Sequence, residues 1–546
     1  MKIARATAAL LSLAAAAPVA AQSAAPTVTA PAGAVRGTTE GALRVFRGIP
    51  YAQPPVGGLR WRPTRPLPHW AGVREATAFG PACVQPQGGP PSVYSPAAPM
   101  PVSEDCLTLN IWAPADATHA PVFFWIHGGA LLTGSSREPM YDGAKLAAQG
   151  IVVVSINYRL GVLGWLAHPD LSRESPAQVS GNYGLLDQIG ALHWVHDNIA
   201  AFGGDPATVT IAGESAGGLS VLYLMESPLA RGLFTRAVAQ SSYMISMPEL
   251  KHAAFGAPSG EAMGQMLAAG LQAPDLAALR GMDAQALTNA AAKLGFAPFG
   301  IVDGKALPEQ MTTAFDAGRQ APVSVLAGFN QGEIRSLRML APAAPPTAAA
   351  YEQAIRARYG DLADAFLRLY PAADYRESII ATSRDALYGW TAQRLAVKQT
   401  AIGQPAWLYE WDHGYPAMDT AGLHAFHASE LPFVFGTIAT VPPRWPAIPD
   451  TAAERTLSDA MVSYWASFAR TGVPQAPGAA TWQAYGAAGN YLRFGDTPVA
   501  ATGLFPGMYA LNEAVMCRRR AAGKAGWNWN VGLASPTLPA DTPACR

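Results

Sequence analysis

The segment with the clearest chemical character runs from Val209 to Leu219 and contains Gly213-Glu-Ser-Ala-Gly217. A short β-branched run precedes this pentapeptide and an apolar pattern with helical spacing follows it, which is typical of a strand, a sharp turn and a helix. In such a nucleophile elbow the two glycines leave room for neighbouring backbone, and Ser215 stands at the head of the turn with its hydroxyl exposed. Because glycine and serine are abundant in this chain, the interpretation also requires a base, an acid and N–H donors elsewhere in the sequence.

A glycine turn that could hold an oxyanion follows the apolar run Val122–Ile126. In Phe123-Phe-Trp-Ile-His-Gly-Gly-Ala130 a buried strand leads directly into two glycines. Backbone N–H groups can converge on a developing negative charge at such a place, and Ala216, the residue after the serine, would supply a further N–H. The two segments together indicate nucleophilic catalysis by a serine.

The acid and the base remain open on spacing alone. Where a serine stands on such a turn, its partners follow in the order acid, histidine, at the carboxyl ends of parallel strands. Glu333 comes just after a short buried strand expected over 322–330, which suits the acid, although an ordinary exposed loop glutamate would look the same. The histidines that follow Ser215 are His252, His413, His424 and His427. Spacing does not choose among the last three.

The composition describes a large globular protein without a polyanionic partner. The chain has 546 residues, of which 50% are hydrophobic and 14% are charged, and its formal net charge is zero. A large core is therefore available, and nothing basic enough to bind nucleic acid is present. No Cys-x-x-Cys or His-x-x-x-His spacing indicates a metal site, and the chemistry expected of Ser215 requires no metal or organic cofactor.

The first 21 residues are predicted to be an export signal. Lys2 and Arg5 precede an apolar run over 6–17 and the small residues Val19-Ala-Ala21, after which we expect cleavage. A membrane anchor is the alternative, but the run is too short to span a bilayer. We therefore expect an exported, periplasmic or secreted protein with no membrane span, in which residues 22–546 form a single large domain.

The four cysteines fit an oxidising compartment. Among the three possible connectivities, proximity in the sequence favours Cys83–Cys106 and Cys517–Cys545. The first pair would close the Pro- and Gly-rich segment 84–103, whose only aromatic residue is Tyr94. A loop of this length is either a lid or a disordered surface segment, and the cysteine tether favours the lid.

Hydrophobic periodicity places the other elements along the chain. Continuous apolar runs predict central strands over 122–126 and 151–158, buried on both faces of a mostly parallel sheet. The remaining expectations are an N-terminal antiparallel hairpin over 27–45, helices over 182–202 and 453–471, helical insertions over about 253–294 and 348–401, and a loop-rich tail over about 521–546.

Taken together, these motifs resemble the type-B carboxylesterase family, which includes the cholinesterases and the bacterial para-nitrobenzyl esterases. The resemblance is dense up to about residue 242 and patchier beyond it, where the segments around Glu333 and His427 are the main anchors. The segments that carry it are Phe46-Arg-Gly-Ile-Pro-Tyr-Ala52, Glu104-Asp-Cys-Leu-Thr-Leu-Asn110, His127-Gly-Gly-Ala130, Asn157-Tyr-Arg159, Gly184-Leu-Leu-Asp-Gln188, Phe202-Gly-Gly-Asp-Pro206 and Gly213-Glu-Ser-Ala-Gly-Gly218.

The resemblance implies an α/β-hydrolase fold, a large mostly parallel sheet flanked by helices, and it selects the acid and the base. The family's base lies in a His-x-x-Glu segment before an apolar Phe-x-Phe-Gly, which selects His427 with Glu430 behind it. Its acid lies in a Gly-x-Asn-x-x-Glu pattern, which selects Glu333. The oxyanion donors that carry over are the N–H groups of Gly129, Ala130 and Ala216.

Other family features imply supporting roles without chemistry. Glu214 and Ser241 resemble residues that stand behind the elbow and the acid, and Cys83–Cys106 resembles the family's first disulfide. The internal ion pairs that the resemblance implies are Arg47 with Glu104 and Arg159 with Asp187.

The implied reaction is hydrolysis of a carboxylic ester through an acyl-enzyme on Ser215. The same residues could serve an amidase, a lactonase or a thioesterase, and the family also contains catalytically silent binding proteins, although these lack the serine that is present here. The substrate is expected to be a small-molecule or bulky natural ester, because the chain also resembles bacterial enzymes that act on polyesters such as mycotoxin side chains. Choline esters are disfavoured, because the first cysteine loop holds Tyr94 and no tryptophan. The sequence leaves the oligomeric state open.

Overall fold

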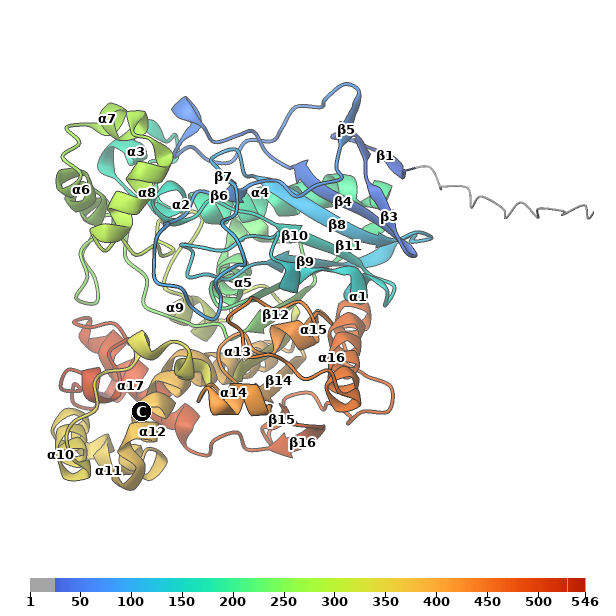
Figure 1. The fold of residues 1–546 in the computed structure, drawn as a ribbon. Coiled ribbons are helices and arrows are strands. Elements are labelled where there is room, and N and C mark those ends of the chain that lie inside the picture. The colour runs from blue at the N-terminus through green and yellow to red at the C-terminus, as the bar shows by residue number, and fades with distance from the viewer. Residues whose placement is uncertain (1–24, 528, 546) are drawn as a thin grey trace, which may run out of the picture.

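The fold is built on one large mixed β-sheet flanked by helices (Figure 1). The computed structural model describes residues 25–527 and 529–545, so the predicted export signal over 1–21 lies outside the described residues. Within that part of the chain, eleven strands form the sheet. In sheet order they are β16 (Pro498–Thr502), β15 (Asn490–Phe494), β14 (Ala406–Trp411), β13 (Ser324–Asn330), β12 (Arg236–Gln240), β11 (Gly204–Glu214), β9 (Ala120–Ile126), β10 (Val152–Ile156), β8 (Thr108–Pro114), β4 (Leu43–Pro50) and β3 (Thr38–Glu40).

The centre of the sheet is parallel and its two edges are antiparallel. Strands β10, β9, β11, β12, β13, β14 and β15 follow one another in parallel. At one edge β8, β4 and β3 pair antiparallel, and at the other edge β16 does. Every residue of β10 is buried, as expected for a strand covered on both faces. The predicted α/β-hydrolase fold is therefore confirmed.

The chain reverses its direction of travel across the sheet at β9. From β9 it moves to β10 on one side, and it then returns past β9 to form β11 on the other side. In open α/β sheets, ligands bind outside the carboxyl ends of the strands at such a switch point. The glycine turn after β9 and Ser215 after β11 both lie there.

Two smaller sheets and the helices complete the fold. In the region of the expected hairpin, β1 (Thr27–Ala30) pairs antiparallel with β2 (Gly33–Arg36), beside which β5 (Val73–Glu75) lies. Near the first cysteine, β6 (Ala82–Cys83) pairs with β7 (Val102–Ser103). The α-helices are α1 (Ala144–Ala147), α2 (Gly161–Trp165), α3 (Pro169–Glu174), α4 (Tyr183–Asn198), α5 (Ala216–Glu226), α6 (Gly260–Gly270), α7 (Leu276–Gly281), α8 (Ala284–Lys293), α9 (Met311–Asp316), α10 (Ala348–Tyr359), α11 (Ala363–Leu369), α12 (Tyr375–Arg384), α13 (Trp390–Ala401), α14 (Pro416–Thr420), α15 (Leu431–Val434), α16 (Ala452–Thr471) and α17 (Met508–Ala522).

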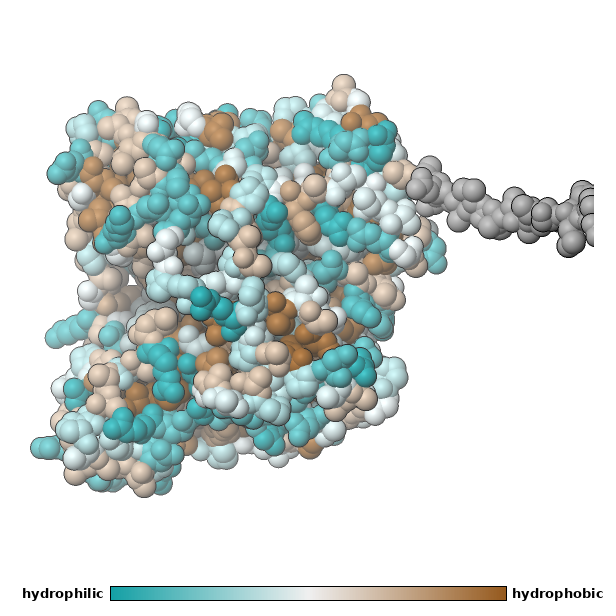
Figure 2. Space-filling model, in the orientation of Figure 1, coloured by the Kyte–Doolittle hydropathy of each residue, from teal (hydrophilic) through white to brown (hydrophobic). Residues whose placement is uncertain are grey.

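Two groups of helices lie beside the sheet at the left of Figure 1, α6–α8 above and α10–α12 below. The first group comes between β12 and β13 in the chain, and the second between β13 and β14. The first group packs with residues of α2 to α4 and the second with residues of α17, in two hydrophobic clusters separate from the two large clusters that contain the strands of the main sheet. Figure 2 shows polar and apolar side chains interspersed over this face, with a notch at the left edge between the two groups. Among the helices of the described residues, none combines the length and the apolar character needed to cross a membrane.

Two disulfides and a buried ion pair link distant parts of the chain. The disulfides are Cys83–Cys106 and Cys517–Cys545, which together use all four cysteines. The expected pair Arg159–Asp187 is present and buried, with Nε of the arginine 2.8 Å from Oδ2 of the aspartate.

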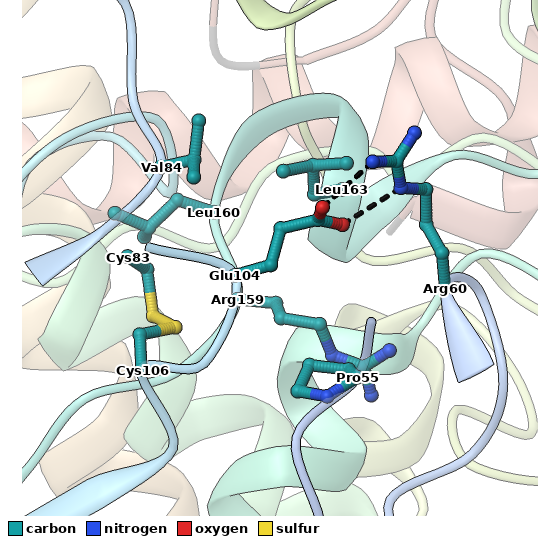
Figure 3. Close-up of a pocket in the computed structure, with 9 residues that line it drawn as sticks. All are labelled: Pro55, Arg60, Cys83, Val84, Glu104, Cys106, Arg159, Leu160 and Leu163. Atoms are coloured by element: carbon teal, nitrogen blue, oxygen red, sulfur yellow. Dashed lines mark hydrogen bonds and ion pairs between the residues drawn. A yellow bond between two sulfur atoms is a disulfide. The ribbon is translucent and has the colours of Figure 1, made fainter. Parts of the chain in front are cut away.

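The expected ion pair between Arg47 and Glu104 is wrong. Glu104 instead accepts two hydrogen bonds from Arg60, from Nε at 2.7 Å and from Nη2 at 2.6 Å, near the Cys83–Cys106 disulfide (Figure 3). Arg47 lies on β4, whose hairpin partner β3 carries Glu40, and Nη2 of Arg47 lies 2.9 Å from Oε2 of Glu40. Pairing within the hairpin therefore prevails over the pairing that the family resemblance implied.

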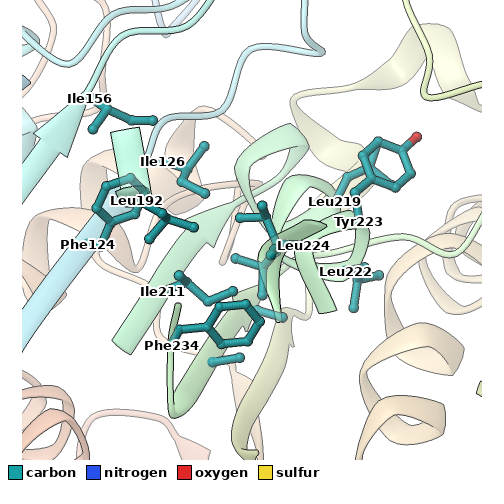
Figure 4. Close-up of a cluster of buried hydrophobic side chains, with 14 of the residues drawn as sticks. Phe124, Ile126, Ile156, Leu192, Ile211, Leu219, Leu222, Tyr223, Leu224 and Phe234 are labelled. Atoms are coloured by element: carbon teal, nitrogen blue, oxygen red, sulfur yellow. The ribbon is translucent and has the colours of Figure 1, made fainter. Parts of the chain in front are cut away.

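The elbow helix α5 lies inside the core. All of its residues are buried, and Figure 4 shows Leu219 and Leu224 in one cluster with Ile211 of β11 and Phe124 of β9. Burying each side chain of this size stabilises the fold by about 1.5–3 kcal/mol. The packing therefore fixes the height of Ser215 above the sheet.

Candidate active site

Ser215 lies on the sharp turn between β11 and α5 and is partly exposed. Its φ of 57° and ψ of −120° are strained for a residue with a Cβ, at a cost on the order of 1–3 kcal/mol. Residues larger than glycine do not fit at Gly213 and Gly217, on either side of this turn. A Cβ on Gly217 would lie 2.1 Å from the carbonyl oxygen of Ile126, and one on Gly213 would lie 2.4 Å from the carbonyl carbon of Gly217.

The glycine turn after β9 adjoins the elbow. A Cβ on Gly128 would lie 3.3 Å from the Cβ of Ser215, so the two turns are in van der Waals range. Gly129 and Ala130 have φ angles of 105° and 57°, a left-handed backbone in which successive N–H groups can face one concave surface. Within residues 25–527 and 529–545, the N–H groups of Gly129, Ala130 and Ala216 donate to no protein acceptor. They are free to bind an oxyanion.

His127 supports this turn as a neutral side chain. Its ring stacks on Tyr158, with 4.6 Å between ring centroids, and its Nδ1 lies 2.8 Å from the carbonyl oxygen of Gly128. The hydroxyl of Tyr158 donates to the carbonyl oxygen of His127 at 2.9 Å. Burial lowers the pKa of His127 to about 4, so the ring carries no charge at neutral pH and only fixes the path of the turn.

The structure brings Glu333 and His427 together. Glu333 follows β13 and His427 lies in the loop after β14, and these neighbouring parallel strands end at the same edge of the sheet. Nδ1 of His427 is hydrogen-bonded to Oε2 of Glu333, whose Oε1 accepts the backbone N–H of Asn330 at 2.8 Å. Glu333 is fully buried and His427 is 5% exposed. A carboxylate held at both oxygens fixes the orientation of the imidazole and leaves Nε2 for proton transfer.

Nε2 of His427 lies on the side of the elbow, 3.1 Å from Oε1 of Glu214. Within the described residues, the hydroxyl of Ser215 and His427 form no hydrogen bond with each other. Catalytic hydrogen bonds are often long before substrate binds and tighten in the complex. The structure thus pairs the expected acid, Glu333, with the expected base, His427. Nε2 of His427 contacts Glu214, the residue directly before the expected nucleophile, Ser215.

The other two candidate histidines that follow β14 are each held between two carboxylates away from the elbow. Their partners are Glu454 and Asp496 for His413, and Asp412 and Asp419 for His424. Neither contacts Glu333 within the described residues, so the structure distinguishes the three histidines that spacing left equivalent.

Two further buried carboxyl groups lie close to His427. Burial raises the pKa of Glu214 to about 8 and that of Glu430 to about 7. Burial opposes charge on His427 as well, but the carboxylates of Glu214 and Glu333 outweigh it and raise the pKa of His427 to about 9. The site therefore favours the imidazolium, the form that a general base reaches in the transition state.

Sequence reasoning missed two amide side chains that hold Glu430. Asn330 Nδ2 donates to Oε2 of Glu430 at 2.6 Å, and Gln240 Nε2 donates to Oε1 at 3.0 Å. The available signal is positional, because the two amides end β13 and β12 and the carboxyl ends of parallel strands meet at the site. Ser241 follows Gln240 and is buried, and within the described residues its hydroxyl has no hydrogen-bond partner.

Aromatic rings connect His427 with the C-terminal tail. The ring centroid of Tyr388 lies 5.2 Å from that of His427, Tyr243 lies 6.0 Å from Tyr388, and Trp529 lies 6.2 Å from Tyr243. Tyr388 belongs to a π-helical turn, Asp385–Gly389, a local irregularity that is frequent at functional sites. Trp529 of the tail is thus the outer member of this series, and it is 39% exposed.

The fold, together with the family comparison, defines a hydrolase built on an α/β sheet. Residues 24–510 match the model of the carboxylesterase family, and the chain belongs to that family of carboxylic ester hydrolases. It is 37% identical over 490 residues to fumonisin B1 esterase of Sphingopyxis macrogoltabida, covering 86% of this chain and 87% of that relative. It is 38% identical over 472 residues to para-nitrobenzyl esterase of Bacillus subtilis, covering 84% and 92%. A solved structure of a thermophilic PNB esterase superposes with a TM-score of 0.76 at 33% identity, over 89% of this chain and 99% of that one.

Proposed function

We propose that this carboxylesterase cleaves its ester in two acyl-transfer steps, with Ser215 as the nucleophile. His427 accepts the proton of the Ser215 hydroxyl as the oxygen attacks the ester carbonyl, and it then donates that proton to the leaving alcohol. Glu333 orients the imidazole and stabilises its charged form. The N–H groups of Gly129, Ala130 and Ala216 receive the negative charge of the tetrahedral intermediate. Water repeats the sequence on the acyl-enzyme and restores the free serine.

The observation that carries this proposal is the convergence of four strand ends on one place. The strained turn of Ser215, the free N–H groups of Gly129 and Ala130, and the buried pair Glu333–His427 come from β11, β9 and the neighbours β13 and β14. The ester-hydrolase relatives support the bond that is cleaved. Removing one N–H donor from such a hole typically lowers turnover about 10²- to 10³-fold, so the glycine turn belongs to the catalyst.

Export belongs to the same proposal. The basic, apolar and small-residue pattern over 1–21 supports secretion to the periplasm or the medium, and the disulfides support an oxidising compartment. Fractionation of the producing cells tests it, since we expect activity outside the cytoplasm and a mature chain that begins near residue 22.

The substrate we propose is an ester with a bulky apolar part. The aromatic series leads from His427 through the buried rings of Tyr388 and Tyr243 to the exposed Trp529, which makes this side of the base apolar. One relative is named for a large natural product, fumonisin B1. A panel of para-nitrophenyl esters that differ in acyl size tests this choice. A kcat/KM that falls as the acyl group grows from acetyl to an aromatic acyl would contradict it.

The decisive test of the mechanism compares Ser215→Ala with Ser227→Ala. Ser227 caps the opposite end of α5 from Ser215 and is buried, so its variant controls for the loss of a hydroxyl near α5. We expect Ser215→Ala to lose both ester hydrolysis and labelling by a fluorophosphonate, and Ser227→Ala to keep both. Full hydrolysis by Ser215→Ala would overturn the proposed nucleophile. A higher kcat/KM on the amide of a matched ester and amide pair would overturn the proposed bond.

A further inference from the structure

The turn that carries His427 has a strained backbone. Ala425 and Ala428, on either side of the histidine, have φ angles of 44° and 67°, and non-glycine residues in this region cost on the order of 1–2 kcal/mol each. Such a conformation persists only where surrounding contacts over-determine it. The groups that hold this turn therefore also hold the base in its place.

Three consecutive carbonyl oxygens of this turn each accept a hydrogen bond from outside it. The N–H of Gly332 donates to Ala425 at 2.9 Å, and Nδ2 of Asn330 donates to Phe426 at 2.9 Å. Both donors flank the acid Glu333 closely. The third carbonyl, that of His427 itself, accepts the hydroxyl of Tyr94 at 2.9 Å. Tyr94 comes from an unrelated part of the chain, the segment between the first two cysteines.

The same hydroxyl also contacts the turn of the acid. Tyr94 Oη lies 2.7 Å from Oγ of Ser336, three residues after Glu333. Since the phenol has a single proton and donates it to His427, Ser336 is the donor in the second contact. Burial raises the pKa of Tyr94 well above its ordinary value, so the phenol remains a donor throughout the working range of an esterase. One oxygen thus bridges the two turns whose side chains must meet.

The ring of Tyr94 is packed independently of its hydroxyl. Its centroid lies 6.3 Å from that of Phe426 and 6.1 Å from that of Trp445, and these two rings are 4.6 Å apart. A phenylalanine at position 94 would keep these contacts and lose only the two hydrogen bonds. The substitution therefore separates the hydroxyl from the packing.

The segment that presents Tyr94 is closed by Cys83–Cys106 and tied to the oxyanion turn. The amide of Gln85 donates to the carbonyl oxygen of Gly134 at 3.0 Å and accepts the N–H of Gly134 at 3.0 Å. Helix α8 contributes two more contacts, from Gln285 to the carbonyl oxygen of Gln85 and from the backbone N–H of Gln87 to Asn289. The segment is thus anchored close to Cys83, and Tyr94 extends from it to the turns that carry Glu333 and His427.

We propose that Tyr94 is a positioning residue of this esterase: its hydroxyl, presented by the loop that Cys83–Cys106 closes, holds the turn of His427 against the turn of Glu333. This inference rests on the proposed function, because the contact between His427 and Glu333 affects turnover only if these residues act as base and acid. It gives the segment 84–103 a role in turnover rather than in covering the site.

The test is Tyr94→Phe, measured per active site. Fluorophosphonate titration of Ser215 counts the competent sites, and steady-state hydrolysis of para-nitrophenyl acetate then gives kcat and KM for each site. We expect kcat to fall about 10-fold, the effect of about 1.4 kcal/mol, with KM changed less than about 2-fold. The acid limb of the pH profile should also move to lower pH, because a looser contact with Glu333 lowers the pKa of His427. A merely structural role would reduce the number of sites and leave the limb in place.

Two further variants keep the inference testable. Tyr351→Phe is the matched control, since its buried hydroxyl also donates to a carbonyl oxygen, that of Tyr370 at 3.1 Å, in the separate cluster around α10 and α11. We expect it to leave kcat per site and the pH limb unchanged. The double variant Cys83→Ser/Cys106→Ser frees the loop, and we expect the same loss of kcat, with no additional loss when Tyr94→Phe is added.

An unchanged kcat per site and an unmoved pH limb in Tyr94→Phe would overturn the inference, as would an equal loss in Tyr351→Phe. If the kcat losses of Tyr94→Phe and of the double cysteine variant were strictly additive, the claim that the disulfide-closed loop positions Tyr94 would be wrong. The proposed function fails in a different way, because protein that hydrolyses esters without reacting at Ser215 would give no titratable site even in the wild type.

Discussion

Replacing Glu214 by glutamine is expected to move the acid limb of the profile of kcat/KM against pH to lower pH. The base must be neutral to accept the proton of Ser215, so kcat/KM rises as His427 loses its proton. A carboxylate beside the imidazolium raises the pKa of His427. Its removal therefore lets His427 become neutral at a lower pH.

The size of the shift follows from the geometry. Oε1 of Glu214 lies 3.1 Å from Nε2 of His427, and two full charges at that distance interact by about 5 kcal/mol at an effective dielectric constant of about 20. Because burial raises the pKa of Glu214 to about 8, about a tenth of Glu214 is charged at pH 7, which leaves about 0.5 kcal/mol, and it approaches full charge at higher pH. Since one pKa unit corresponds to about 1.4 kcal/mol, the limb should move down by at least about 0.4 and at most about 3.6 pH units.

The assay is the pH dependence of kcat/KM for para-nitrophenyl acetate, followed at the isosbestic wavelength of the product. Glu226→Gln is the control, because Glu226 ends α5, the helix that begins just after Glu214 and Ser215, and burial also raises its pKa to about 8. An unmoved or raised limb in Glu214→Gln, or an equal shift in Glu226→Gln, would refute the reasoning that Glu214 acts on the base directly.

Two further substitutions test the elbow and the buried ion pair. Gly217→Ala should lower kcat/KM by about 100-fold or more, because a Cβ 2.1 Å from the carbonyl oxygen of Ile126 must displace the turn, and a displacement of about 1 Å can cost that factor. Asp187→Asn should lower the free energy of unfolding by about 3–5 kcal/mol, seen as a lower Tm, because it leaves the buried charge of Arg159 without its partner.

Each of these two substitutions has a matched control. Gly281→Ala adds a methyl group where nothing lies within 4 Å, and it should leave kcat/KM unchanged; the same loss there would argue against a steric cause. Glu75→Gln removes one partner of the exposed pair with Arg36, for which we expect a change below about 1 kcal/mol. An equally small effect of Asp187→Asn would contradict the stated cost of an unpaired buried charge.

The elbow and the central strands could be predicted from the sequence because their signals are local. The turn of Ser215 needs a strand before it, a helix after it and glycines at two fixed positions, and all of these lie within Val209–Leu219. Burial on both faces makes the central strands continuous apolar runs, which few other elements produce.

The pairing of acid and base could not be derived in the same way. Glu333 and His427 are 94 residues apart, and three histidines occupy similar positions after β14. Only the path of the loop after β14 decides which of them faces the elbow. The sequence does not encode that path locally, so the choice of His427 depended on the family resemblance. The same resemblance failed for Arg47, because this largely buried arginine pairs with the carboxylate that its own hairpin supplies, that of Glu40.

The contact between Tyr94 and His427 had no signal at all in the sequence. The segment 84–103 has no hydrophobic period, and its single aromatic residue carried no indication of a partner 333 residues away. Hydrogen bonds between loops depend on tertiary geometry that neither composition nor spacing encodes.

The separate hydrophobic clusters of α6–α8 and α10–α11 have a consequence for how such an enzyme can change. The first group shares its small cluster with residues of α2 to α4 and the second shares its cluster with α17. Both enter the chain between strands that remain neighbours in the sheet, β12, β13 and β14. Helices inserted between neighbouring strands can change in length without changing the register of those strands, whereas the contact between Gly217 and the carbonyl oxygen of Ile126 tolerates almost no variation.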